Sequence, residues 1–125
     1  MQTAPSSPAS IVVLISGSGS NLQAIIDGVE AGTISGQITA VISNKSGVKG
    51  LERAAKHGIA NYVLDHKEHV DRESYDHALR TLIDQHNPNL IILAGFMRIL
   101  TEPFVQHYEG KMLNIHPSLL PKFKG

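Results

Sequence analysis

The feature that most constrains this chain is a regular alternation of short apolar runs with helical patterns. The apolar runs occupy positions 11–15, 38–42, 61–64, 90–94 and 112–115, and they predict five strands. The helical patterns lie between Ser20 and Gly32, at 51–57, at 72–86 and after Pro103. Parallel strands that alternate with helices are joined by right-handed crossovers and have both faces covered. The sequence therefore predicts an α/β fold with a doubly wound, mostly parallel sheet.

Composition narrows the classes of partner. The 125 residues are 42% hydrophobic and 18% charged, which is typical of one globular core. The 11 basic residues only balance the 11 acidic ones, and aromatic residues make up 5%, so nucleic acid is disfavoured as a partner. Cysteine is absent, which excludes disulfides and thiolate metal sites and fits the cytoplasm. The run at 11–15 is too short for a signal peptide or a membrane span.

The first residues differ from the rest of the chain. Positions 2–10 are rich in Ala, Pro and Ser and hold few hydrophobic side chains. Such a segment buries too little surface to offset the entropy of ordering. We therefore expect a disordered tail over 1–10 and a single domain over 11–125.

The first candidate site is the glycine-rich segment 16–21, between a predicted strand and a helix. Ligands of parallel sheets bind where strands end, and the N–H groups at a helix start attract anions, so this turn suits a phosphate. Ser20 is predicted as N-cap of the helix, with Gln23 completing a capping box. Leu22 stands where a dinucleotide fingerprint has its third glycine, which disfavours NAD, and no P-loop lysine follows, which disfavours nucleotide hydrolysis. The alternative is a turn that only caps the helix.

The second candidate segment, 95–100, leaves the fourth predicted strand and stays apolar. It suits a pocket for a flat organic ligand, with backbone groups as the polar contacts. The alternative is core packing for Met97, Ile99 and Leu100, and a solvated surface charge for Arg98.

The third candidate segment pairs Asn114 with His116 at the end of the last predicted strand. Residues two apart on a strand face the same side, so these two side chains project together while Ile115 faces the opposite layer. An amide donor beside an imidazole suits a reaction that develops negative charge on oxygen and moves a proton, such as acyl transfer. The alternative is a hydrogen-bonded polar pair at a strand end.

Two further histidines have a spacing that a metal could use. His66 and His69 would share one face of a helix, although the surrounding stretch also reads as a solvated polar loop. Neither the composition nor the three candidate segments requires a metal, and we expect none.

Three motifs together resemble one enzyme family. They are IVVLISGSGSNLQAII at 11–26, LAGFMRIL at 93–100 and LNIHPSLLP at 113–121. They are similar to those of the phosphoribosylglycinamide formyltransferases, the folate-dependent glycinamide ribonucleotide transformylases of purine synthesis. The histidine motif is shared with methionyl-tRNA formyltransferase and formyltetrahydrofolate deformylase, whereas the glycine segment is more selective.

The resemblance implies a Rossmann-like fold of the formyltransferase type and a specific reaction. The amine of glycinamide ribonucleotide would attack the formyl carbon of 10-formyltetrahydrofolate, the formyl donor. By this analogy the catalytic pair is Asn114 and His116. The substrate phosphate would lie on Gly19, Ser20 and Asn21, and the folate would contact Arg72, Met97, Arg98, Ile99, Leu100 and Asn114.

One departure from the family concerns length. The family continues beyond the His-Pro-Ser motif and supplies there an aspartate that pairs with the histidine, whereas this chain ends at Gly125. We therefore expect a domain truncated on its C-terminal side. Whether this domain is active by itself stays open. The alternatives are a phosphate-binding half-domain without turnover, or a sister enzyme such as the deformylase. A homodimer also stays open.

Overall fold

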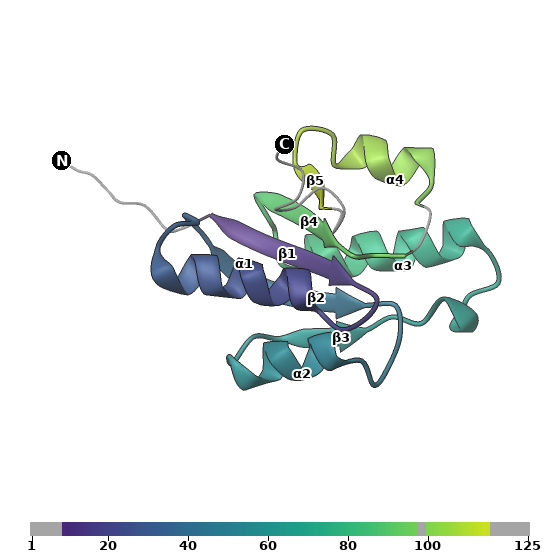
Figure 1. Cartoon of the computed structure of the whole chain (residues 1–125). Coiled ribbons are helices and arrows are strands. Elements are labelled where there is room, and N and C mark those ends of the chain that lie inside the picture. The colour runs from purple at the N-terminus through teal and green to yellow at the C-terminus, as the bar shows by residue number, and fades with distance from the viewer. Residues whose placement is uncertain (1–8, 98–99, 116–125) are drawn as a thin grey trace, which may run out of the picture.

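The structure is a computed structural model that describes residues 9–97 and 100–115. Its centre is a five-stranded, all-parallel sheet in the order β3-β2-β1-β4-β5 (Figure 1). The strands are β1 (Ser10–Ile15), β2 (Gln37–Ser43), β3 (Asn61–Val63), β4 (Leu90–Ala94) and β5 (Met112–Ile115). The helices are α1 (Ser20–Ala31), α2 (Lys49–Lys56), η1 (His66–Glu68), α3 (Arg72–Asp84) and α4 (Glu102–His107). The predicted fold class is confirmed.

The side chains of the sheet alternate between two apolar clusters. On one face, Ile11, Val13 and Ile15 of β1 pack with buried residues of α1 and α2. On the other face, Val12 and Leu14 pack with buried residues of α3 and α4. Figure 1 shows these helix pairs on opposite sides of the strands. This two-residue alternation explains why β1, in the middle of the sheet, is apolar at every position from 11 to 15.

Several predicted boundaries shift. β2, β3, α2 and α3 each differ by one or two residues at one or both ends, and two further changes concern the starts of β1 and α1. β1 begins at Ser10, which is paired with Gln37, so the expected tail does not extend to residue 10. The predicted capping box at Ser20 is wrong. Ser20 is already helical, the N-cap is Gly19 in a left-handed conformation, and no side chain caps the helix. The C-terminal end of α1 is as predicted, because Gly32 takes the left-handed C-cap position.

Helix α4 is held against α3 by a buried tyrosine. The Tyr108 hydroxyl donates to Asp84 Oδ1 at 2.7 Å, and its oxygen lies 3.3 Å from the carbonyl oxygen of Arg80, the second possible acceptor. The ring of Tyr108 packs edge-on against that of Phe104, with centroids 5.1 Å apart. Burial of the hydroxyl, together with its hydrogen bond to the Asp84 carboxylate, raises the pKa of Tyr108 well above the ordinary tyrosine value.

This contact predicts a loss of stability in alkali. Because the folded state holds the Tyr108 proton more tightly than the unfolded chain does, its contribution to stability is complete below the unfolded pKa of about 10 and falls as the pH rises above it. Urea unfolding at pH 8 and pH 11 should show a smaller decline for Tyr108→Phe than for the wild type. Equal declines in the two proteins would contradict this role.

Candidate functional site

The glycine segment wraps around the carboxyl end of β1 and rests directly on α2. Gly19 has a φ of 79°, and a Cβ atom added there would lie 2.6 Å from the Cα of Gly50. The Gly50 N–H donates to the carbonyl of Gly17 at 3.1 Å. Both glycines are therefore required by a close approach of two backbones. The turn directs the chain into α1, whose first N–H groups have no intrahelical acceptors.

A cavity of about 280 Å³ lies beside this turn. Its lining comes from the turn, from the loop after β2 and from the end of β4 and the residues that follow it: Ser16, Gly17, Ser18, Gly19, Ser20, Asn21, Lys45, Ala94, Gly95 and Met97. The first two candidate segments thus meet at the carboxyl edge of the sheet, as expected for a parallel α/β protein. Lys45 was missed by the sequence analysis, although its position two residues after β2 could have indicated it.

A buried serine joins the ends of three strands. The Ser16 hydroxyl donates to Asn44 Oδ1 at 2.6 Å and accepts the N–H of Met97 at 2.7 Å. Ser16 and Asn44 are each only 3% exposed. Because buried hydrogen bonds of this kind are costly to break, Ser16 holds the glycine turn, the end of β2 and the segment after β4 in one arrangement.

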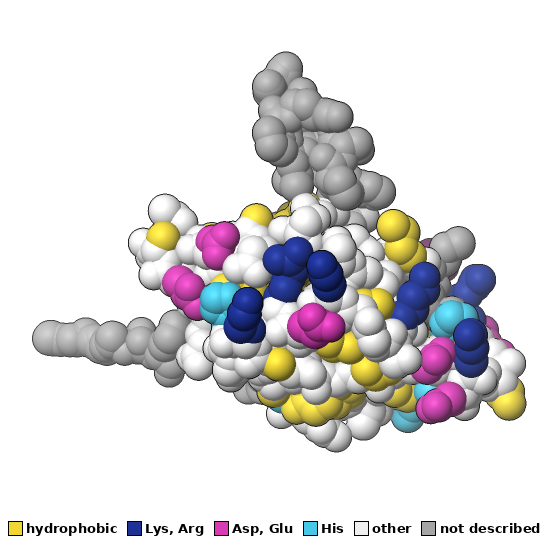
Figure 2. All heavy atoms as spheres, turned by 60° about the horizontal axis from the view of Figure 1, so that its bottom comes forward, with side chains coloured by type: hydrophobic (Ala, Val, Ile, Leu, Met, Phe, Trp, Pro, Cys, Tyr) yellow, Lys and Arg dark blue, Asp and Glu magenta, His cyan; other side chains and the backbone are white. Residues whose placement is uncertain are grey.

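Basic side chains of α2 border the turn on its outer side. Figure 2 shows Lys and Arg side chains gathered on one face, with acidic groups among them. Lys49, Arg53 and Lys56 line one hollow on α2 together with Glu52. Arg53 is the one that reaches the turn, since its Nε donates to the carbonyl of Ser18 at 2.8 Å. This contact stabilises the turn and adds positive charge near it.

In the apolar segment after β4, some residues pack in the core and one lines the cavity. Phe96 and Leu100 pack against the apolar cluster of α3 and α4, as core packing predicts. Met97 is 76% exposed and lines the cavity, as a ligand pocket predicts. Arg98 and Ile99 lie outside the described residues.

Asn114 lies one strand further from the glycine turn. It is opposite Leu93 in the β4–β5 register and lines a hollow with Val105 and Tyr108 on the α4 side of the sheet. Ile115 packs against the cluster on the other face, so the predicted alternation of these two residues is confirmed. Asn114 does not line the glycine-turn cavity, and His116 lies outside the described residues.

Arg72 is exposed as the first residue of α3, after the N-cap Asp71. The helix follows β3 and so begins at the same edge of the sheet as the glycine turn. Arg72 is not among the residues that line the turn's cavity. Within the described chain it forms no ion pair with Glu68 or Asp76, the partners that a purely structural role would give it.

The histidine pair at 66 and 69 has local contacts. The ring of His69 packs edge-on against Tyr75, with centroids 5.4 Å apart, and His66 lies 3.8 Å from the Asp65 carboxylate. Over residues 9–97 and 100–115, no group of three or more His, Cys, Asp or Glu side chains is arranged to hold a metal ion. In the same part of the chain, no helix is long and apolar enough to cross a membrane.

The parallel sheet, the glycine turn before α1 and the cavity at the carboxyl edge define a doubly wound α/β protein with a glycine-rich strand end. The family model for formyl transferase matches residues 9–125. The chain therefore belongs to the formyl transferase family.

The similar proteins include phosphoribosylglycinamide formyltransferases and a purine biosynthetic protein. Phosphoribosylglycinamide formyltransferase of Escherichia coli is 56% identical over 115 residues, which are 92% of this chain and 54% of that protein. The human trifunctional purine biosynthetic protein adenosine-3 is 52% identical over 117 residues, 94% of this chain and 12% of that protein. The solved phosphoribosylglycinamide formyltransferase of Coxiella burnetii superposes with a TM-score of 0.86 at 50% identity, covering 95% of this chain and 56% of that one. This chain spans about half the length of the bacterial relative.

Proposed function

We propose that this chain belongs to an enzyme that transfers the formyl group of 10-formyltetrahydrofolate to the amine of glycinamide ribonucleotide. The observation that carries the proposal is the cavity in which the glycine turn, the start of α1, Lys45 and Met97 meet. It offers N–H donors and a cation to a phosphate, and an exposed apolar side chain to the second ligand. The family and the names of the relatives support the same reaction.

The ribonucleotide phosphate is assigned to the turn itself. Gly19, Ser20 and Asn21 would present N–H groups at the positive end of the α1 dipole. Lys45, whose side chain is exposed at the same cavity, would add a full charge. This assignment gives the left-handed Gly19 a reason beyond capping, because the sharp turn at Gly19 would aim these N–H groups at the phosphate.

The folate is assigned to the neighbouring segment. Met97 and Leu100 would contact its ring system, with Arg98 and Ile99 between them and Arg72 near its glutamate tail. In the chemical step, the ribonucleotide amine forms a bond to the formyl carbon, and the bond from that carbon to N10 of the folate breaks. Asn114 and a protonated His116 would donate to the oxyanion of the tetrahedral intermediate. His116 would pass a proton to the leaving nitrogen, and the proton that the attacking amine loses would return the imidazole to its protonated form. We further propose that the substrates are small molecules, that the enzyme is cytoplasmic and that the reaction needs no metal.

Calorimetric binding and a transfer assay with the purified protein test the proposal. We expect glycinamide ribonucleotide to bind, and Lys45→Ala to weaken that binding about fivefold at low salt and less at high salt, since the exposed charge is screened. Lys67→Ala, an exposed lysine on η1, is the control and should change nothing. Binding with formyl transfer supports the enzyme, and binding without turnover supports a phosphate-binding half-domain. No binding of the ribonucleotide would overturn both.

A further inference from the structure

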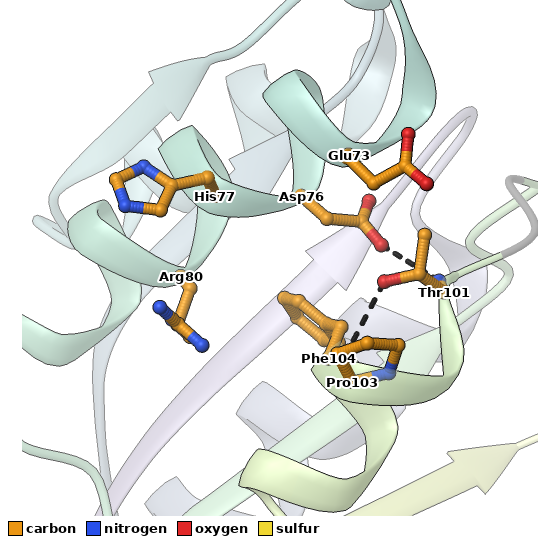
Figure 3. A pocket seen from close by; sticks show the side chains of 7 residues that line it. All are labelled: Glu73, Asp76, His77, Arg80, Thr101, Pro103 and Phe104. Atoms are coloured by element: carbon orange, nitrogen blue, oxygen red, sulfur yellow. Dashed lines mark hydrogen bonds between the residues drawn. The ribbon is translucent and has the colours of Figure 1, made fainter.

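We propose that Asp76 is a positioning residue for the folate side of the site, although it lies on α3 and outside the glycine-turn cavity. The inference rests on the proposed function. Its starting point is a carboxylate that is only 4% exposed between α3 and the segment leading into α4. Figure 3 shows the Asp76 side chain pointing from α3 toward Thr101.

The contact that Asp76 makes is specific. Its Oδ2 accepts the backbone N–H of Thr101 at 2.7 Å, whereas Oδ1 has no hydrogen-bond partner in the described part of the chain. Burying a carboxylate is costly unless it is hydrogen-bonded. The buried carboxylate therefore fixes the position of one backbone amide, which lies 25 residues further along the chain.

Thr101 is the downstream end of the segment that follows β4. Its Oγ1 accepts the N–H of Phe104 and caps α4, so the Asp76 contact also sets where α4 begins. At the upstream end, the N–H of Met97 is held by the buried hydroxyl of Ser16. Met97 and Leu100, which we assign to the folate, are therefore each at or next to a residue whose N–H is held by a buried side chain, Met97 by Ser16 and Thr101 by Asp76.

The Ser16 and Asp76 contacts differ in which part of the site they hold. Ser16 belongs to the glycine turn and bonds to Asn44, so its loss would disturb both substrates. Among the described residues Asp76 forms a hydrogen bond with Thr101 and none with the turn, and the cavity beside it is lined by α3 and α4 residues such as Glu73, Arg80 and Pro103. Loss of the Asp76 contact should thus weaken folate binding and leave the ribonucleotide unaffected.

The test compares Asp76→Ala, Asp76→Asn and Ile83→Val, the last a substitution of a fully buried α3 residue away from Thr101. Amide exchange followed by NMR should show the Thr101 N–H exchanging at least about tenfold faster in Asp76→Ala. Calorimetry should show 10-formyltetrahydrofolate binding about tenfold more weakly in that variant, with ribonucleotide affinity unchanged. Asp76→Asn keeps an acceptor for Thr101 and should restore both values, and Ile83→Val should match the wild type in both.

Two results would overturn the inference. One is an unchanged Thr101 exchange rate in Asp76→Ala, and the other is an equal weakening of both ligands. A wild-type protein that binds the ribonucleotide but not the folate would instead overturn the proposed function on its folate side. In that case the exchange rates still decide whether Asp76 positions the segment.

Discussion

Replacing Gly19 with Ala is expected to lower the free energy of unfolding by about 3 kcal/mol and ribonucleotide affinity about 100-fold. Two costs add at this position. The left-handed φ of 79° is unfavourable for alanine. In addition, the alanine Cβ would lie 2.6 Å from the backbone Cα of Gly50, so α2 or the turn must move. Any such movement also misplaces the N–H groups proposed to hold the phosphate. Urea unfolding and calorimetry measure the two effects.

Gly32→Ala is the matched control because it separates these costs. Gly32 ends the same helix with a φ of 83°, but a Cβ there meets nothing within 4 Å. This variant should lose only about 1 kcal/mol, the cost of the conformation alone, and bind the ribonucleotide as the wild type does. If both variants lost the same stability and Gly19→Ala bound normally, the close approach to Gly50 would have no role in the site.

Replacing His116 with Ala is expected to reduce the rate of formyl transfer about 1000-fold and to change ribonucleotide affinity less than about twofold. The reason is chemical: the imidazole is proposed to donate to the oxyanion and to move a proton, and neither role contributes to holding the phosphate at the glycine turn. Steady-state kinetics with both substrates, together with calorimetric binding of the ribonucleotide, separates the two quantities.

His107→Ala is the control for this experiment. His107 is an exposed histidine at the end of α4. It contacts Asp84 at 3.2 Å and is not among the residues that line the hollow beside Asn114. Its substitution should leave turnover unchanged. Weaker ribonucleotide binding with unchanged turnover in His116→Ala would contradict the catalytic role and assign the histidine to substrate binding.

The architecture could be predicted from the sequence because its signals are local. β4 and β5 have the predicted bounds, and Gly32 ends α1 as its place after the last apolar residue indicates. The position of the glycine turn after β1 could be predicted for the same reason, since strand, turn and helix follow one another without interruption between Ser10 and Ala31. The predicted capping box is wrong because Ser20 and Gln23 fit it by residue type and spacing, and neither reveals the backbone conformation of Gly19. The left-handed conformation of Gly19 places the helix start one residue earlier than a serine cap would.

The sequence by itself determined the strands and helices, because apolar periodicity and turn residues act within a few positions. The alternation of these elements then determined that the sheet is parallel and that its carboxyl edge is where ligands are expected. Only the tertiary structure decided the contacts that make this edge a site. Gly19 lies on Gly50, Lys45 faces the turn, Ser16 holds the N–H of Met97 81 residues away, and Asp76 holds Thr101. Each joins segments that are distant in the chain, and no local pattern encodes such a pairing, because it depends on how the strands are ordered and how closely the helices pack.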